Sequence, residues 1–184
     1  LAKLNEEMIE TWTEILSKVE GSLLILRARQ FNDENLKTDT IRRFLNRGLS
    51  TKRLLLEGNK TRKGMLAGYR KVDIALDTFP YGGTTTTFEA LCMGAPVITM
   101  RGDRWVGLVG ASLLNTLGLG DLVAESRTDY VNRAIALAKD IGKLKSLRTS
   151  LSKKVISSPL CDTVSFTRNL ESAIRKAWIR HCSA

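Results

Sequence analysis

Apolar and polar positions along the chain follow two patterns that alternate. Downstream of Asn5, apolar side chains recur every three or four positions from Ile9 to Val19, which predicts a helix over about residues 5–19 with Asn5 as its cap. The stretch SLLILRA at 22–28 is instead a short continuous apolar run, which is typical of a strand buried on both faces. Helix-like and strand-like segments therefore alternate from the start of the chain.

This alternation continues to the C-terminus. It predicts further strands at 53–57, 73–78, 96–100 and 121–124, and further helices near 33–47, 61–70, 84–93, 105–117, 127–140, 142–156 and 163–181. Strands separated by single helices pair in parallel through right-handed crossovers, and uniformly apolar strands need helices on both faces. The sequence thus predicts an α/β fold with a doubly wound, mainly parallel, Rossmann-like sheet of about five strands, followed by C-terminal helices.

Composition narrows the class of protein. The chain has 184 residues, of which 43% are hydrophobic and 26% charged, as expected for one globular domain over residues 1–184. No apolar run approaches the ~18 residues of a membrane span, and no segment resembles a signal peptide, so we expect a cytoplasmic protein without membrane contacts.

The widely spaced Cys92, Cys161 and Cys182 match no metal-ligand pattern, and we expect free thiols and no metal site. Because the first residue is Leu1 and not methionine, we also expect the chain to be part of a larger protein.

The net charge is +10, which fits nucleic acid, an anionic membrane surface or phosphorylated small molecules equally well. The basic residues are spread along helical segments such as 42–47 and 143–154, with few aromatic residues between them. This arrangement favours solvated helix faces over a nucleic-acid surface.

One stretch, YGGTTTTFEAL at 81–91, has a composition suited to chemistry more than to a core. Gly82 and Gly83 permit positive φ angles and let a ligand approach the main chain. Thr84–Thr87 then fall at a helix start, where free N–H groups, the helix dipole and hydroxyls suit a phosphate. Glu89, one turn further on, suits ribose hydroxyls, so the stretch indicates a nucleotide site. The alternative is that one threonine simply caps the helix and the others are tolerated. The stretch matches neither a P-loop nor a dinucleotide fingerprint.

Several ordered motifs make the chain recognisable. VDIALDTFPYGGTTTTFEALCMGAPVITMRGDR, then GASLLNTLGLGDLVAES and SSPLCDTVSFTRNLE, resemble the C-terminal half of the protein O-linked N-acetylglucosamine transferase family. The similarity is to the bacterial members with tetratricopeptide repeats, extends to the SPINDLY-like plant relatives, and covers essentially the whole chain. It implies the C-terminal, donor-binding lobe of a two-lobed GT-B glycosyltransferase, with the N-terminal lobe and the repeats missing from this chain.

The resemblance also implies roles for single residues. Thr85 and Thr86 match the threonines that hold the donor diphosphate, and Glu89 matches the acidic residue that binds the ribose. Lys3, nine positions before Trp12, matches the lysine that neutralises the departing diphosphate. A lysine and a helix N-terminus can do this without a metal, so no cofactor is expected besides the nucleotide-sugar donor as substrate. The expected donor-binding residues are Lys60, Arg62, Met65, Gly83, Thr84, Thr85, Thr86, Thr87 and Glu89.

The chain departs from the family pattern at three positions near the expected donor. Met65 stands in MLAGYRKVD where the family usually has a histidine that stacks on the base, and methionine covers a base face more loosely. GDRWVGLVG has Trp105 and Leu108 in place of a histidine and an arginine. Lys60 and Arg62 lie near the expected base and ribose without matching the family by identity.

These observations lead to one hypothesis and one alternative. The hypothesis is an inverting glycosyltransferase that moves N-acetylglucosamine from UDP-N-acetylglucosamine to serine or threonine of a protein acceptor, with this lobe inactive by itself. The alternative is a non-catalytic nucleotide-sugar-binding or scaffold relative whose donor site has degenerated. The only histidine, His181, lies near the C-terminus, where we expect it on the surface, so no general base is assigned.

Overall fold

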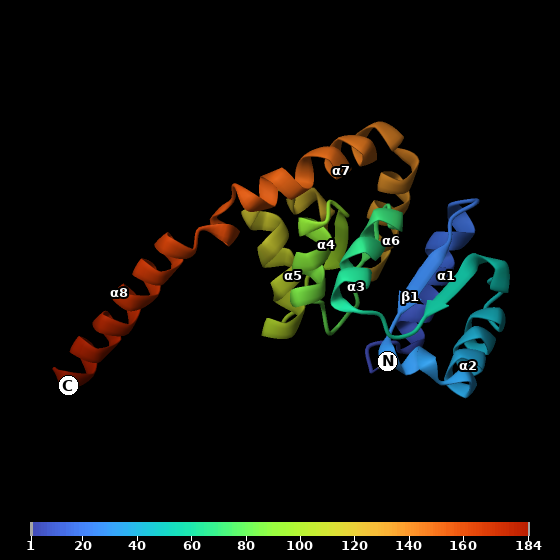
Figure 1. Ribbon diagram of the computed structural model, residues 1–184, viewed down its shortest axis with the longest axis horizontal. Coiled ribbons are helices and arrows are strands. Elements are labelled where there is room, and N and C mark those ends of the chain that lie inside the picture. The colour runs from blue at the N-terminus through green and yellow to red at the C-terminus, as the bar shows by residue number, and fades with distance from the viewer. Residues whose placement is uncertain (1, 184) are drawn as a thin grey trace.

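The computed structural model describes residues 2–183, and it has the alternating helices and strands that the sequence predicts (Figure 1). The helices are α1 (Glu6–Lys18), α2 (Glu34–Leu45), α3 (Arg62–Gly68), α4 (Thr85–Cys92), α5 (Trp105–Thr116), α6 (Arg127–Lys139), α7 (Ile141–Ile156) and α8 (Thr163–Cys182). The strands are β1 (Leu24–Arg27), β2 (Leu54–Glu57), β3 (Ala75–Leu76), β4 (Val97–Met100) and β5 (Val123–Ala124). Every predicted element forms, and most helix ends fall within two residues of their predicted positions.

The helix starts agree with the prediction because the residues that cap them can be recognised in the sequence. The Asn5 side chain accepts a hydrogen bond from the Met8 amide at the start of α1, at 2.8 Å. Asp33, Ser126 and Asp162 cap α2, α6 and α8 in the same way. These caps satisfy amide groups that a helix start otherwise leaves without partners.

All strand pairs are parallel, as predicted, but the strands form two sheets. In the first sheet β1 pairs with β2, and Leu24 lies opposite Leu54. In the second, the order is β3-β4-β5, with Ala75 opposite Val97. The prediction of one continuous sheet of five strands is therefore wrong in this detail. The cause is the shortness of β3, whose two residues form a ladder with β4 alone.

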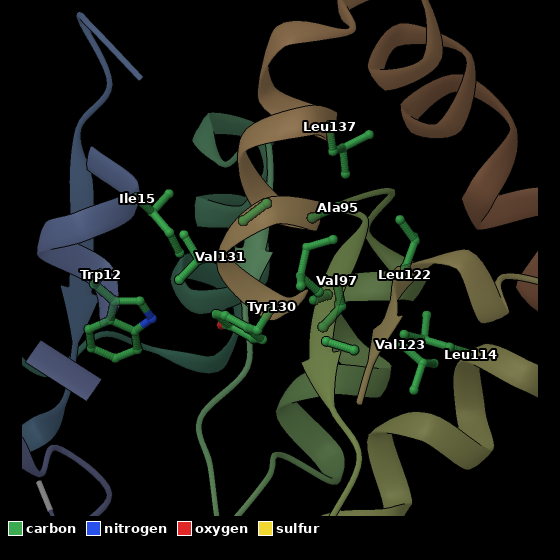
Figure 2. Packing of buried hydrophobic residues seen from close by; sticks show 14 of the residues in the cluster. Trp12, Ile15, Ala95, Val97, Leu114, Leu122, Val123, Tyr130, Val131 and Leu137 are labelled. Carbon is green, nitrogen blue, oxygen red and sulfur yellow. The ribbon is translucent and has the colours of Figure 1, made fainter. Parts of the chain in front are cut away.

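The two sheets share one hydrophobic core, because buried residues from both belong to a single cluster. α1 packs against α6, and Figure 2 shows Trp12 and Ile15 facing Val131 and Tyr130. α5 and α6 both pack against β4. The core thus fixes the carboxyl ends of β3 and β4 relative to the N-terminal helix.

The last helix, α8, stands apart from this core. It projects away from the other elements (Figure 1), and the exposed fractions of its apolar side chains are large. Phe166, Leu170, Ile174 and Trp178 follow one another at four-residue intervals and form an apolar stripe along the helix. His181 lies in its last turn and is exposed, as the sequence indicated. None of the helices within residues 2–183 is long and apolar enough to cross a membrane.

Candidate nucleotide-sugar site

The threonine run lies at the N-terminus of α4. Thr84 is the residue before the helix, and its side chain makes no capping hydrogen bond, so the capping alternative does not describe this structure. Thr84, Thr85 and Thr86 are exposed, whereas Thr87 is buried with 4% of its surface exposed. The first amide groups of α4 have no carbonyl partner within the helix. Three hydroxyls and several N–H groups are therefore presented together at the positive end of the helix dipole.

The two glycines before this helix provide space and not an unusual backbone conformation. Neither Gly82 nor Gly83 adopts the positive φ angle that glycine permits. A Cβ atom at Gly83 would lie 2.4 Å from the Thr87 hydroxyl oxygen and 2.7 Å from that of Thr86. Both distances are shorter than a Cβ atom and a hydroxyl oxygen can approach without a clash, so the tight turn into α4 requires glycine at this position.

Lys3 lies beside this turn, although 79 positions separate it from Gly82 in the sequence. Its Nζ donates a hydrogen bond to the Gly82 carbonyl oxygen at 2.7 Å and lies 4.2 Å from the centroid of the Tyr81 ring. Partial burial lowers the pKa of Lys3 from its ordinary value, and the nearby Asp77 opposes that shift. The structure thus brings the predicted lysine and the predicted threonines into one site.

Sequence reasoning missed Asp77, which follows β3. Its carboxylate accepts hydrogen bonds from the Gly83 amide at 2.6 Å, the Thr78 amide at 2.9 Å and the Thr99 hydroxyl at 2.9 Å. Asp77 is 8% exposed, and burial raises its pKa above the ordinary aspartate value, with the three hydrogen bonds and Lys3 acting in the opposite direction. An acidic residue that directly ends an apolar strand was the available signal.

A cavity of about 120 Å³ opens between Tyr69, β3 and the first turn of α4. Its lining residues are Tyr69, Ala75, Leu76, Asp77, Thr86, Thr87, Ala90 and Val97. The Tyr69 hydroxyl donates to the Thr86 carbonyl oxygen at 3.1 Å. Burial, and then the charge of Glu89, raises the pKa of Tyr69. Tyr69 is the second residue at the site that the sequence prediction did not include.

The predicted base and ribose residues lie on α3, on α4 and in the segment before α3. Arg62 and Glu89 form an ion pair at 3.2 Å, in which the arginine is 78% exposed and the glutamate only 13%. Met65 is 37% exposed, so its thioether is accessible to a ligand. Lys60 pairs with Glu57 at 3.1 Å, which directs its charge toward the end of β2. The structure therefore joins Arg62 to Glu89 and engages Lys60 elsewhere.

The two other departures from the family pattern lie next to the same loop. α5 begins at Trp105, and the Gly82 amide donates to the Val106 carbonyl oxygen at 3.1 Å. Trp105 is 71% exposed and Leu108 is 36% exposed. The first turn of α5 thus presents large apolar groups beside the Gly82–Gly83 turn.

A parallel α/β fold, with a polar helix N-terminus at the carboxyl ends of its strands, defines a Rossmann-like domain. The family model described as Glycosyl transferase family 41 matches residues 1–170, and the chain belongs to this family of glycosyltransferases. The resemblance seen in the sequence is thereby confirmed.

Individual relatives agree with this assignment. The "Probable UDP-N-acetylglucosamine--peptide N-acetylglucosaminyltransferase SPINDLY" of Hordeum vulgare is 42% identical over 99% of this chain and 19% of its own length. The SEC protein of Arabidopsis thaliana, which carries the same enzyme description, is 30% identical over 100% of this chain and 18% of its own length. A solved point mutant of the Thermobaculum terrenum O-GlcNAc transferase superposes with a TM-score of 0.94 at 36% identity, covering 99% of this chain and 35% of that one. The chain spans about a fifth of the length of these curated relatives.

Proposed function

We propose that this chain is the donor-binding lobe of an inverting protein O-glycosyltransferase that transfers N-acetylglucosamine from UDP-N-acetylglucosamine to serine or threonine. One observation carries the proposal: Lys3 Nζ is held at 2.7 Å by the Gly82 carbonyl, beside the threonines that open α4. A cation and a helix N-terminus that converge in this way suit a diphosphate.

The chemistry follows from where charge develops. When the sugar leaves the donor, the nucleoside diphosphate gains negative charge, and stabilising that charge lowers the barrier to transfer. Lys3 would supply a positive charge, while the amides and hydroxyls of Thr84–Thr86 would supply hydrogen bonds that are already oriented. Glu89 would accept hydrogen bonds from the ribose, once a ligand displaces or joins its exposed partner Arg62.

The proposal includes a protein acceptor, a second lobe and, in the whole protein, possible tetratricopeptide repeats. Its support is the length of the relatives, of which the chain covers 18–20%. The apolar stripe of α8 supports it as well, because no other element among residues 2–183 covers that stripe. A second lobe packed on this stripe would bury it and complete the enzyme.

Calorimetric titration tests the donor site directly. UDP, GDP and their sugars should bind the wild type with millimolar or tighter affinity, and UDP-N-acetylglucosamine should bind better than the GDP-sugars. Thr85→Ala and Lys3→Ala should each weaken binding, whereas Thr149→Ala, an exposed threonine on α7, should not. If none of the nucleotides binds, or if both site variants bind like the wild type, the donor-lobe proposal is wrong.

The exposed apolar groups favour a second candidate function, a binding or scaffold protein that has kept the fold without the transfer chemistry. Met65 and Trp105 occupy positions where the family usually has histidine, and both are accessible. Sugar transfer to peptides by the full-length protein distinguishes the two functions. Robust turnover that depends on Lys3 would eliminate the scaffold candidate, and donor binding without turnover would support it.

A further inference from the structure

The Asp77 carboxylate is held by three neutral donors that come from different segments. The Thr78 and Gly83 amides belong to the loop after β3, and the Thr99 hydroxyl belongs to β4. The main chain of Asp77 is fixed as well. Its amide donates to the Ile98 carbonyl at 2.9 Å, and its carbonyl accepts from the Tyr130 hydroxyl at 2.8 Å. This residue therefore has one fixed position in the core.

The surrounding backbone leaves room for this one carboxylate. A Cβ atom at Gly82 would lie 3.3 Å from an Asp77 carboxylate oxygen, one at Gly83 3.1 Å and one at Gly110 2.9 Å. At Gly110, it would also lie 2.5 Å from the Thr99 hydroxyl that donates to Asp77. Three glycines from two separate segments thus surround a buried acidic group, whose burial carries a free-energy cost that its hydrogen bonds must offset.

The hydrogen bond from Gly83 connects Asp77 to the proposed donor site. Gly83 is the last residue before Thr84 and α4, so its position determines where the first turn of α4 points. Gly82, the preceding residue, holds Lys3 through its carbonyl oxygen. A displaced turn would move both the lysine and the threonines that face the proposed diphosphate.

We propose that Asp77 is a positioning residue for the proposed transfer reaction: by holding the Gly83 amide it keeps Lys3 and the N-terminus of α4 directed at the same diphosphate. The inference rests on the proposed function. It assigns Asp77 no contact with the donor, because the residue is only 8% exposed and its carboxylate already accepts three hydrogen bonds. It assigns the effect to hydrogen bonding and not to the negative charge.

Asp77→Ala and Asp77→Asn separate these two effects. Alanine removes every hydrogen bond to the side chain. Asparagine keeps an oxygen for the Gly83 and Thr78 amides and can donate its amide to the Thr99 hydroxyl, which can rotate to accept. Asp77→Ala should raise the calorimetric Kd for UDP about tenfold or more, while Asp77→Asn should stay within about threefold of the wild type.

A second readout distinguishes positioning from a general loss of structure. The affinity for UDP should fall more than the affinity for UMP in Asp77→Ala, because a moved turn loses its contacts with the second phosphate. Hydrogen exchange of the Gly83 amide should accelerate in Asp77→Ala and stay slow in Asp77→Asn. If Asp77→Ala does not fold, Thr99→Val replaces it, since valine keeps the buried volume and removes one donor; Thr99→Ser, which restores the hydroxyl, is its control.

The outcomes separate the two proposals. A wild type that binds no nucleotide overturns the proposed function and, with it, this role of Asp77. A wild type that binds UDP, together with an Asp77→Ala variant of equal affinity and equal UDP-to-UMP ratio, overturns the positioning role alone. Equal weakening by alanine and asparagine would also overturn it, because the effect would then follow the charge.

Discussion

Replacing Lys3 with methionine removes one positive charge from the candidate site and keeps most of the length of the side chain. Lys3 Nζ lies 2.7 Å from the Gly82 carbonyl oxygen, so a phosphate at the α4 N-terminus would sit within a few ångströms of it. Two unit charges about 4 Å apart interact by roughly 4 kcal/mol at an effective dielectric constant of about 20. Because Lys3 is only partly buried, solvent screening reduces this to about 1–2 kcal/mol. Lys3→Met should therefore weaken UDP binding by about five- to thirtyfold.

Isothermal calorimetry at low and at moderate ionic strength measures this change. The wild-type affinity should fall with added salt more steeply than that of Lys3→Met, because one charge pair is screened in the wild type and absent in the variant. Lys139→Met is the matched control. It makes the same charge change in the last turn of α6. This turn lies about 20 Å along the helix from the α6 N-terminus, which is the end that follows β5. Equal losses in both variants, or a Kd for Lys3→Met within twofold of the wild type, would refute the assigned role.

The same site predicts a pH dependence. Burial lowers the pKa of Lys3, and Asp77 only partly opposes this. Binding needs the protonated amine, so UDP affinity should decline as pH rises, and the decline should begin at a lower pH than an ordinary surface lysine would give. The terminal phosphate is already ionised above about pH 7, because its pKa is near 6, so it adds no trend there. The slope should be absent in Lys3→Met, and a slope that persists in this variant would assign the titration to another group.

Three further changes test other parts of the structure. Gly83→Ala places a methyl group 2.4 Å from the Thr87 hydroxyl and should weaken UDP binding at least about tenfold in calorimetry, whereas Gly142→Ala, with 3.5 Å to its nearest neighbour, should leave binding unchanged. Tyr130→Phe removes a buried hydrogen bond to the main chain after β3 and should lower the free energy of unfolding by about 1–2 kcal/mol in urea titrations; an unchanged value would show that the bond contributes nothing. Met65→His should tighten UDP binding about two- to tenfold if stacking on the base is what methionine lacks, and no gain would place the base elsewhere.

The helices could be predicted well because their determinants are local. Asn5, Asp33 and Ser126 cap helices that begin directly after them, and apolar spacing sets the rest. β3 was predicted over 73–78 and is paired as a strand only at Ala75–Leu76. Strand length depends on which neighbours the backbone can reach, and a single segment does not reveal them. For the same reason, the sequence does not predict the division of the strands into two sheets.

The residues of the candidate site also fall into those that the sequence predicts and those that it does not. The threonines and Glu89 stand together in one short stretch, so their common location could be read from the sequence. Lys3 could be linked to them only through the resemblance to a family, since nothing local connects it to Gly82. Asp77 was missed because its burial depends on Gly110, which lies 33 positions later and leaves the room that the carboxylate fills.

A chain of hydrogen bonds joins the core to the candidate site, and it couples stability to binding. Tyr130, fully buried, donates to the main chain of Asp77; the Asp77 carboxylate holds Gly83; and the adjacent Gly82 holds Lys3. A ligand that draws Lys3 and the first turn of α4 toward itself acts on a turn whose position the core already fixes. The ordering cost that a mobile loop would have to meet on binding is therefore largely met on folding. It follows that core variants such as Tyr130→Phe should weaken nucleotide binding as well as stability, although Tyr130 itself is fully buried in the core.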